Sequence, residues 1–317
     1  MGEHHHSHHG PPPGHGDSHG HGHSHAPAGG AGRAFRWSIV LNSGLTALQL
    51  VIGFAFGSLA LIGDALHNLG DVVGLALAWG AERLSRRPAA GRFTYGYGRS
   101  THLASLLNAL LIFSAGVVVV VEALQRLAHP VPLVTGPVAW AAAAGIGINL
   151  LSARLFGHHH HDLNQRAALL HLLTDAAVSV AVLVSALLVG ATGWLWLDPA
   201  TAIAVGAAVI WSAWGLLGDS LALNLDAVPR GINLHQVEEV LLALPGVRAV
   251  EELHVWGLST SRAALTAHLL VGAGGDPMDS AALLSLARER LGAIGIRKTT
   301  LQIDQPETPR EPMEPRP

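Results

Sequence analysis

The stretch ALHNLGD, residues 65–71, puts a histidine and an aspartate four residues apart inside an otherwise apolar segment. The residues on either side, LALI at 59–62 and VVGLALAW at 72–79, give the segment the length and composition of a membrane-spanning helix. An ionised carboxylate at the centre of such a helix costs roughly 2.5–3.5 kcal/mol even on lenient insertion scales. The sequence therefore predicts that Asp71 has a partner that offsets its charge.

The composition of the chain indicates an integral membrane protein. Of its 317 residues, 50% are hydrophobic and 13% are charged, and the mean hydropathy of +0.37 is too high for an ordinary soluble domain. A formal net charge of -3, without long runs of Lys or Arg, gives no sign of a nucleic-acid partner. Because the chain has no cysteine, disulfides, thiolate zinc sites and thiol catalysis are excluded.

Apolar segments of about 20 residues predict six transmembrane helices. Arginine is concentrated in the connections after the second and fourth helices, so the positive-inside rule places these connections and both chain ends in the cytoplasm. Lys298 is the only lysine, and this preference for arginine suggests a GC-rich bacterial genome and hence a bacterial inner membrane. The helices are expected near residues 37–56, 60–80, 101–124, 133–156, 167–190 and 196–217.

The residues after Leu217 predict a soluble domain. The segment LHQVEEVLLALPG has helical spacing, AVEELHVWGLS and AALTAHLLVG alternate like strands, DSAALLSLARERLG is helical and KTTLQID is a last strand. This αββαβ order favours a small α+β domain of ferredoxin-like type. The predicted division is a His-rich disordered tail (1–35), a transmembrane domain (36–217), a cytoplasmic domain (218–305) and a second disordered tail (306–317).

The His-x-x-x-Asp pattern occurs twice, as HNLGD at 67–71 and as HLLTD at 171–175. Residues four apart share one face of a helix. The second and fifth helices run in opposite directions, so Asp71 lies ~16 Å below the outer end of its helix and Asp175 ~12 Å above the inner end of its own. In a core of about 30 Å these depths nearly coincide, as in an inverted repeat.

Two imidazoles and two carboxylates at one depth predict a tetrahedral zinc site made of His67, Asp71, His171 and Asp175. The alternative is two polar clusters that only join helices through hydrogen bonds. Asp64, three residues before His67, is either a partner that orients the imidazole or part of a water-filled approach.

The chain resembles the cation diffusion facilitator family of six-helix metal/proton antiporters, in its zinc-transporting branch. The resemblance rests on SLALIGDALHNLGDVVGLALA, RFTYGYGRSTHLASLLNA, HHHHDLNQRAALLHLLTDAAVSV and the EELHVWGLS and LTAHLLV segments, and it covers roughly residues 36–306. It implies that the four residues above are the transport ligands, that zinc is exchanged for protons, and that the chain forms a homodimer.

The resemblance also implies a zinc site in the cytoplasmic domain, structural or regulatory. The matching positions are His235, Glu251, His254, His268 and Asp304. A further zinc site that some members carry after the second helix is not expected, because ERLSRRPAAGRF contains no histidine.

Two His-rich segments are expected to hold zinc only loosely, because their irregular settings cannot build a rigid site. They are the tail, with ten histidines before residue 26, and the group His158, His159, His160 and His161.

The sequence therefore predicts a zinc efflux transporter, not an enzyme, with zinc as substrate and protons as counter-ions. An exporter of cobalt, nickel, iron or cadmium could use the same ligands. A membrane metal sensor and an intramembrane zinc enzyme are further alternatives, and the enzyme needs an open coordination position.

Overall fold

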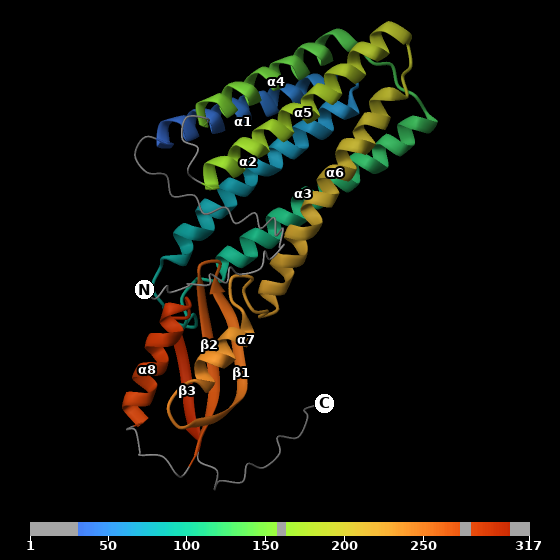
Figure 1. Cartoon of the computed structure of the whole chain (residues 1–317). Coiled ribbons are helices and arrows are strands. Elements are labelled where there is room, and N and C mark those ends of the chain that lie inside the picture. Colours follow the sequence, from blue (N-terminus) through green and yellow to red (C-terminus); the bar gives the residue numbers. More distant parts are fainter. Residues whose placement is uncertain (1–30, 157–162, 273–279, 305–317) are drawn as a thin grey trace, which may run out of the picture.

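The computed structural model describes residues 31–156, 163–272 and 280–304 (Figure 1). Six helices come first, as predicted from the apolar segments, and an α+β domain follows. The helices are α1 (Ala31–Phe56), α2 (Leu59–Ser85), α3 (Ser100–Ala128), α4 (Thr135–Phe156), α5 (Leu163–Thr192) and α6 (Leu197–Asn224). By length and composition, α2 to α6 each contain a segment that can cross a membrane, and α1 contributes a shorter apolar helix, Val40–Phe56.

Several helices are longer than their apolar segments. In particular, α6 continues to Asn224 instead of ending near residue 217, so the predicted domain boundary at 217 and 218 falls inside this helix. The physical reason is that backbone hydrogen bonding continues past the end of the apolar run, which hydropathy alone does not show. Residues 1–30 of the predicted His-rich tail, His158–His161 and the C-terminal tail lie outside the described residues, whereas residues 31–35, predicted as disordered, are the start of α1.

The helices form two groups in the membrane domain. In Figure 1, α1, α2, α4 and α5 lie together, while α3 and α6 pack along each other beside them. Glycines of α2 bring α3 close: a Cβ on Gly70 would lie 2.8 Å from Ile112 Cγ1, and one on Gly74 would lie 2.7 Å from Asn108 Nδ2. Such small residues allow transmembrane helices to approach closely.

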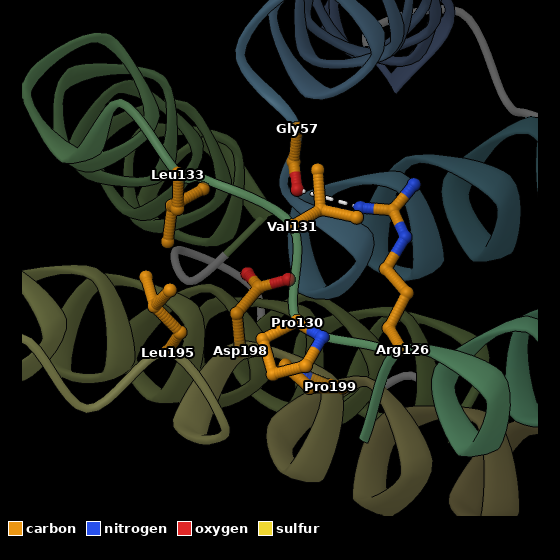
Figure 2. Close-up of a pocket in the computed structure, with 8 residues that line it drawn as sticks. All are labelled: Gly57, Arg126, Pro130, Val131, Leu133, Leu195, Asp198 and Pro199. Atoms are coloured by element: carbon orange, nitrogen blue, oxygen red, sulfur yellow. Dashed lines mark hydrogen bonds between the residues drawn. The ribbon is translucent and has the colours of Figure 1, made fainter. Parts of the chain in front are cut away.

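The end of the helical domain that lies far from the soluble domain is tied together by Asp198 at the start of α6. Its carboxylate accepts hydrogen bonds from Ser58 Oγ (2.5 Å) and from the Leu59 backbone N–H (2.7 Å), at the beginning of α2. Arg126 of α3 donates to the Gly57 carbonyl (2.7 Å), as Figure 2 shows. These contacts join the α1–α2 turn to the α3–α6 pair.

The soluble domain has the predicted αββαβ order. Its elements are α7 (Leu234–Leu242), β1 (Val247–Ser259), β2 (Arg262–Val271), α8 (Ser280–Ala293) and β3 (Lys298–Asp304). The sheet order is β1-β2-β3, with β1 antiparallel to β2 and β2 parallel to β3. Its core contains Val237 and Leu241 of α7, Leu265 and Leu269 of β2, and Leu291 of α8.

The soluble domain contacts the membrane domain where the α2–α3 connection meets the end of α6. Arg99 forms an ion pair with Asp226, and the Thr260 N–H donates to Thr101 Oγ1 (3.1 Å). The Arg-rich connection before α3 therefore lies on the same side of the helical domain as the sheet.

Candidate metal centre

The two His-x-x-x-Asp motifs lie on neighbouring helices, and each motif presents both side chains to the other. On α2, His67 Nε2 lies 3.9 Å from Asp71 Oδ2. On α5, His171 Nε2 lies 3.6 Å from Asp175 Oδ2. The i, i+4 spacing places the two side chains of each motif one turn apart on one face of the helix.

Contacts between the helices are as short as those within them. His67 Nε2 lies 3.4 Å from Asp175 Oδ1, and His171 Nε2 lies 3.1 Å from Asp71 Oδ2. Nitrogen and oxygen atoms thus alternate around a closed set of four side chains, which we call the membrane quartet. Ligand atoms of Asp71, His171 and Asp175 lie within 4.8 Å of one another, a spacing that one metal ion can bridge.

Exposure differs across the membrane quartet. The side chains of His67 and Asp175 are 17% and 4% exposed, whereas those of Asp71 and His171 are 32% and 45% exposed. Because α2 runs toward the soluble domain and α5 runs away from it, Asp71 and His171 are the pair nearer that domain. The pair of ligands nearer the soluble domain is therefore the more exposed pair.

Asp64 is fully buried, and its contacts differ from those that sequence reasoning proposed. Its Oδ2 accepts hydrogen bonds from Gln49 Nε2 (2.8 Å) and Ser179 Oγ (3.1 Å). His67 Nδ1 is buried and has no hydrogen-bond partner among the described residues. In this structure Asp64 therefore binds α1 and α5 rather than orienting the imidazole of His67.

A second histidine and carboxylate cluster lies on the sheet of the soluble domain. His268 Nδ1 lies 3.0 Å from Asp304 Oδ2, and His268 Nε2 lies 3.3 Å from Glu252 Oε2. Gln302 Nε2 donates to the other oxygen of Asp304 (2.8 Å). We call Glu252, His268 and Asp304 the sheet cluster.

The structure adds Glu252 to the residues named from the sequence, because a bulge in β1 brings its carboxylate to His268. The register of β1 and β2 shifts between Glu251 and His254, and Glu252 has a φ of 50°. Glu251 is the backbone partner of His268 in the ladder, while the carboxylate of Glu252 contacts the imidazole. No sequence pattern in this segment marks a bulge.

The two other histidines predicted as ligands in the soluble domain lie on α7 and on β1. His235 is exposed on α7, with its Nε2 3.4 Å from Glu239 Oε1. Helix α7 packs on the sheet face formed by Leu265 and Leu269, and strand alternation directs His268 to the opposite face. His254 is exposed on β1, with Thr266 as its ladder partner.

The sheet cluster fits a bound metal only in part. His268 Nε2 and a Glu252 oxygen are suitable donors, and Asp304 on Nδ1 would fix the orientation of the ring, as carboxylates do for metal-binding histidines. A structural zinc site uses four protein ligands. Among the described residues, His268 Nε2 and Glu252 Oε2 are two donors that one chain places at this position.

Comparison with known proteins gives matches along most of the chain. A profile of the cation efflux transmembrane domain matches residues 36–223, and one of the cation efflux protein cytoplasmic domain matches residues 229–306. Metal cation efflux system protein CzcD of Cupriavidus metallidurans is 37% identical over 76% of this chain and 77% of its own length.

Two further relatives carry names that specify metals. Zinc transporter ZitB of Escherichia coli is 36% identical over 86% of this chain and 87% of its own. A cadmium, cobalt and zinc/H(+)-K(+) antiporter of Bacillus subtilis is 28% identical over 84% of this chain and 87% of its own.

Proposed function

The chain belongs to the cation efflux family, and from this premise we propose that it exports zinc from the cytoplasm in exchange for protons. The observation that carries the proposal is the membrane quartet, in which two imidazoles and two carboxylates from α2 and α5 converge. Imidazole nitrogen and carboxylate oxygen are common zinc ligands, and four of them complete a tetrahedral site. Bound zinc also offsets the two negative charges of Asp71 and Asp175.

Exchange follows from the chemistry of the four ligands. Zinc requires neutral imidazoles and ionised carboxylates, so its binding releases protons and protonation releases zinc. A site that opens alternately to the two sides of the membrane then couples an outward zinc flux to an inward proton flux. The protons occupy the same side chains as zinc, which prevents simultaneous occupation.

The exposure of the quartet supports entry from the cytoplasm. Asp71 and His171 are the more exposed ligands and lie toward the soluble domain. The soluble domain lies beside the Arg-rich α2–α3 connection, which the positive-inside rule assigns to the cytoplasm. We propose that this arrangement corresponds to the inward-facing state of the cycle, in a bacterial inner membrane with both chain ends in the cytoplasm.

We also propose that the chain functions as a homodimer, with a transmembrane domain that extends to Asn224 and a cytoplasmic domain after it. The profile that matches residues 229–306 describes a cytoplasmic domain of efflux proteins. Any metal held at the sheet cluster would stabilise the pairing of two such domains through His268 and Glu252.

Two alternatives differ in what the quartet does. Transport of cadmium or cobalt is favoured by the name of the Bacillus subtilis relative, and these ions accept the same ligands. A zinc enzyme requires an open coordination position for water. The quartet supplies four protein ligands and so favours transport over catalysis.

The test is zinc movement in proteoliposomes that contain a zinc dye and a pH dye, under an imposed proton gradient. Asp175→Ala is measured beside Thr174→Ala, because Thr174 is the neighbour of Asp175 and its hydroxyl donates to the Leu170 carbonyl of its own helix (2.9 Å). Zinc movement opposed by proton movement, lost in Asp175→Ala and kept in Thr174→Ala, is expected. Zinc binding without flux would contradict transport and indicate a sensor.

A further inference from the structure

A second link between α2 and α5 lies one helical turn from the membrane quartet. Asp64 precedes His67 by three residues on α2, and Ser179 follows Asp175 by four residues on α5. Ser179 Oγ donates to Asp64 Oδ2 (3.1 Å). Since the helices run in opposite directions, both positions lie on the same side of the quartet. This side faces away from the soluble domain and is next to the most buried pair of the quartet, His67 and Asp175.

The link extends to α1. Gln49 is completely buried and donates from Nε2 to the same oxygen of Asp64 (2.8 Å). Asn68 Nδ2, on α2, lies 3.5 Å from Gln49 Oε1. The other oxygen of Asp64, Oδ1, is buried and has no hydrogen-bond partner in the part of the chain that the structure describes. Gln49 and Ser179 are therefore the contacts on which the position of the Asp64 carboxylate depends.

Helix α4 closes the cluster from the remaining side. A Cβ on Gly145 would lie 2.9 Å from Ser179 Oγ and 3.1 Å from Gln49 Nε2. Only a residue without a side chain allows α4 to approach this closely. Four helices thus meet at Asp64, and a displacement of α5 from α2 at this level would break its bond to Ser179.

We propose that Gln49, Asp64 and Ser179 determine the metal selectivity of the quartet by fixing the separation of α2 and α5. This inference rests on the proposed transport function. Ligand type alone does not separate zinc from cadmium, so selectivity has to come from geometry. A tightly held α2–α5 separation favours the smaller zinc ion, and a looser separation admits the larger cadmium ion.

Hydrogen bonds that only hold helices together would give a different result. Loss of such a bond lowers the thermal stability and the amount of active protein, and it changes zinc and cadmium transport by the same factor. If these hydrogen bonds position the ligands of the quartet, their loss changes the ratio of cadmium transport to zinc transport. The ratio of cadmium to zinc affinities is therefore the readout that distinguishes the two roles.

The experiment measures how strongly cadmium competes with radioactive zinc for uptake by proteoliposomes containing the full chain. The variants are Gln49→Leu and Ser179→Ala, which remove one donor each and leave the charge of Asp64 in place. The matched control is Ser185→Ala, since Ser185 is a buried serine of the same helix whose hydroxyl has no hydrogen-bond partner among the described residues. Ser179→Ala is the smaller change and decides the matter if Gln49→Leu does not fold.

The measured ratio is the cadmium concentration that halves zinc uptake, divided by the KM for zinc. We expect this ratio to fall about fivefold in both variants and to stay unchanged in Ser185→Ala. An unchanged ratio in Ser179→Ala would overturn the inference, even if the uptake rate fell. Absence of zinc uptake by the wild-type protein would instead refute the proposed function and, with it, this inference.

Discussion

The membrane quartet and the sheet cluster are both built from histidine and carboxylate, but they are held in different ways. In the quartet each helix supplies two ligands one turn apart, so two local motifs and one helix contact complete the set. In the sheet cluster, Glu252, His268 and Asp304 come from three strands and depend on a bulge. The quartet can therefore be predicted from the spacing of residues along each helix. The sheet cluster cannot, because it depends on the register of the strands.

The surroundings of the two clusters differ as well. A carboxylate within a membrane helix costs several kcal/mol unless it is compensated. An ion pair that is exposed to water contributes only about 0 to 1 kcal/mol to the stability of the protein. The side chain of Glu252 is 49% exposed, whereas that of Asp175 is 4% exposed. We therefore propose that the quartet carries transport and that the sheet cluster has a supporting role.

The largest expected effect comes from the removal of one ligand of the quartet. In His171→Ala, zinc transport should fall about 100-fold or more, because the three remaining ligands, one imidazole and two carboxylates, no longer complete a tetrahedral site. Radioactive zinc uptake by proteoliposomes measures the loss. The comparison fails if His268→Ala, at the matching type of residue in the sheet cluster, reduces uptake by a similar factor.

Acidification should weaken zinc binding at the quartet by about tenfold or more per pH unit. The sign follows from the ligands: zinc binds neutral imidazoles and ionised carboxylates, so added protons compete with it and affinity falls as pH falls. Calorimetry at several pH values measures this, with the heat of the Asp175→Ala protein subtracted to isolate the quartet. A quartet affinity independent of pH would contradict proton exchange through these residues.

Exchange of one ligand type should change selectivity more than rate. In His67→Asp, a third carboxylate replaces an imidazole, and we expect cadmium to compete about fivefold better against zinc uptake. The same competition assay in proteoliposomes measures it. His254→Asp in the soluble domain is the matched control, and an equal shift there would show that selectivity does not reside in the quartet.

The smallest effect is expected for the sheet cluster. Asp304→Asn removes the charged partner of His268 Nδ1, and zinc transport should fall by less than about threefold because the quartet is intact. Zinc-dependent stabilisation of the dimer, followed by thermal unfolding at several zinc concentrations, should weaken in the same variant. Transport loss as large as in His171→Ala would remove the distinction between the two clusters.

The helices and the quartet follow from features that act over short stretches of sequence. Hydropathy over about 20 residues finds the spans, and the i, i+4 pattern places His67 beside Asp71 and His171 beside Asp175. The end of α6 at Asn224 was not predicted, since helical hydrogen bonding continues beyond the apolar run.

Features that depend on packing between elements were not accessible from the sequence. The contacts of Asp64 with Gln49 and Ser179 depend on how α1, α2 and α5 are rotated about their axes. In the sequence, Gln49 is a single polar residue within an apolar segment, and nothing beside it marks a partner. The position of His235 on α7, across the sheet from His268, likewise follows from packing of the helix on the sheet.

If the membrane quartet binds the transported zinc, the position of the bound ion tests this most directly. A crystal structure of the zinc-loaded protein, with anomalous scattering measured at the zinc absorption edge, locates zinc independently of the surrounding atoms. The account predicts a peak between His67, Asp71, His171 and Asp175, with zinc about 2.0–2.2 Å from one atom of each. A zinc peak elsewhere among the membrane helices, with these four side chains unligated, would contradict it.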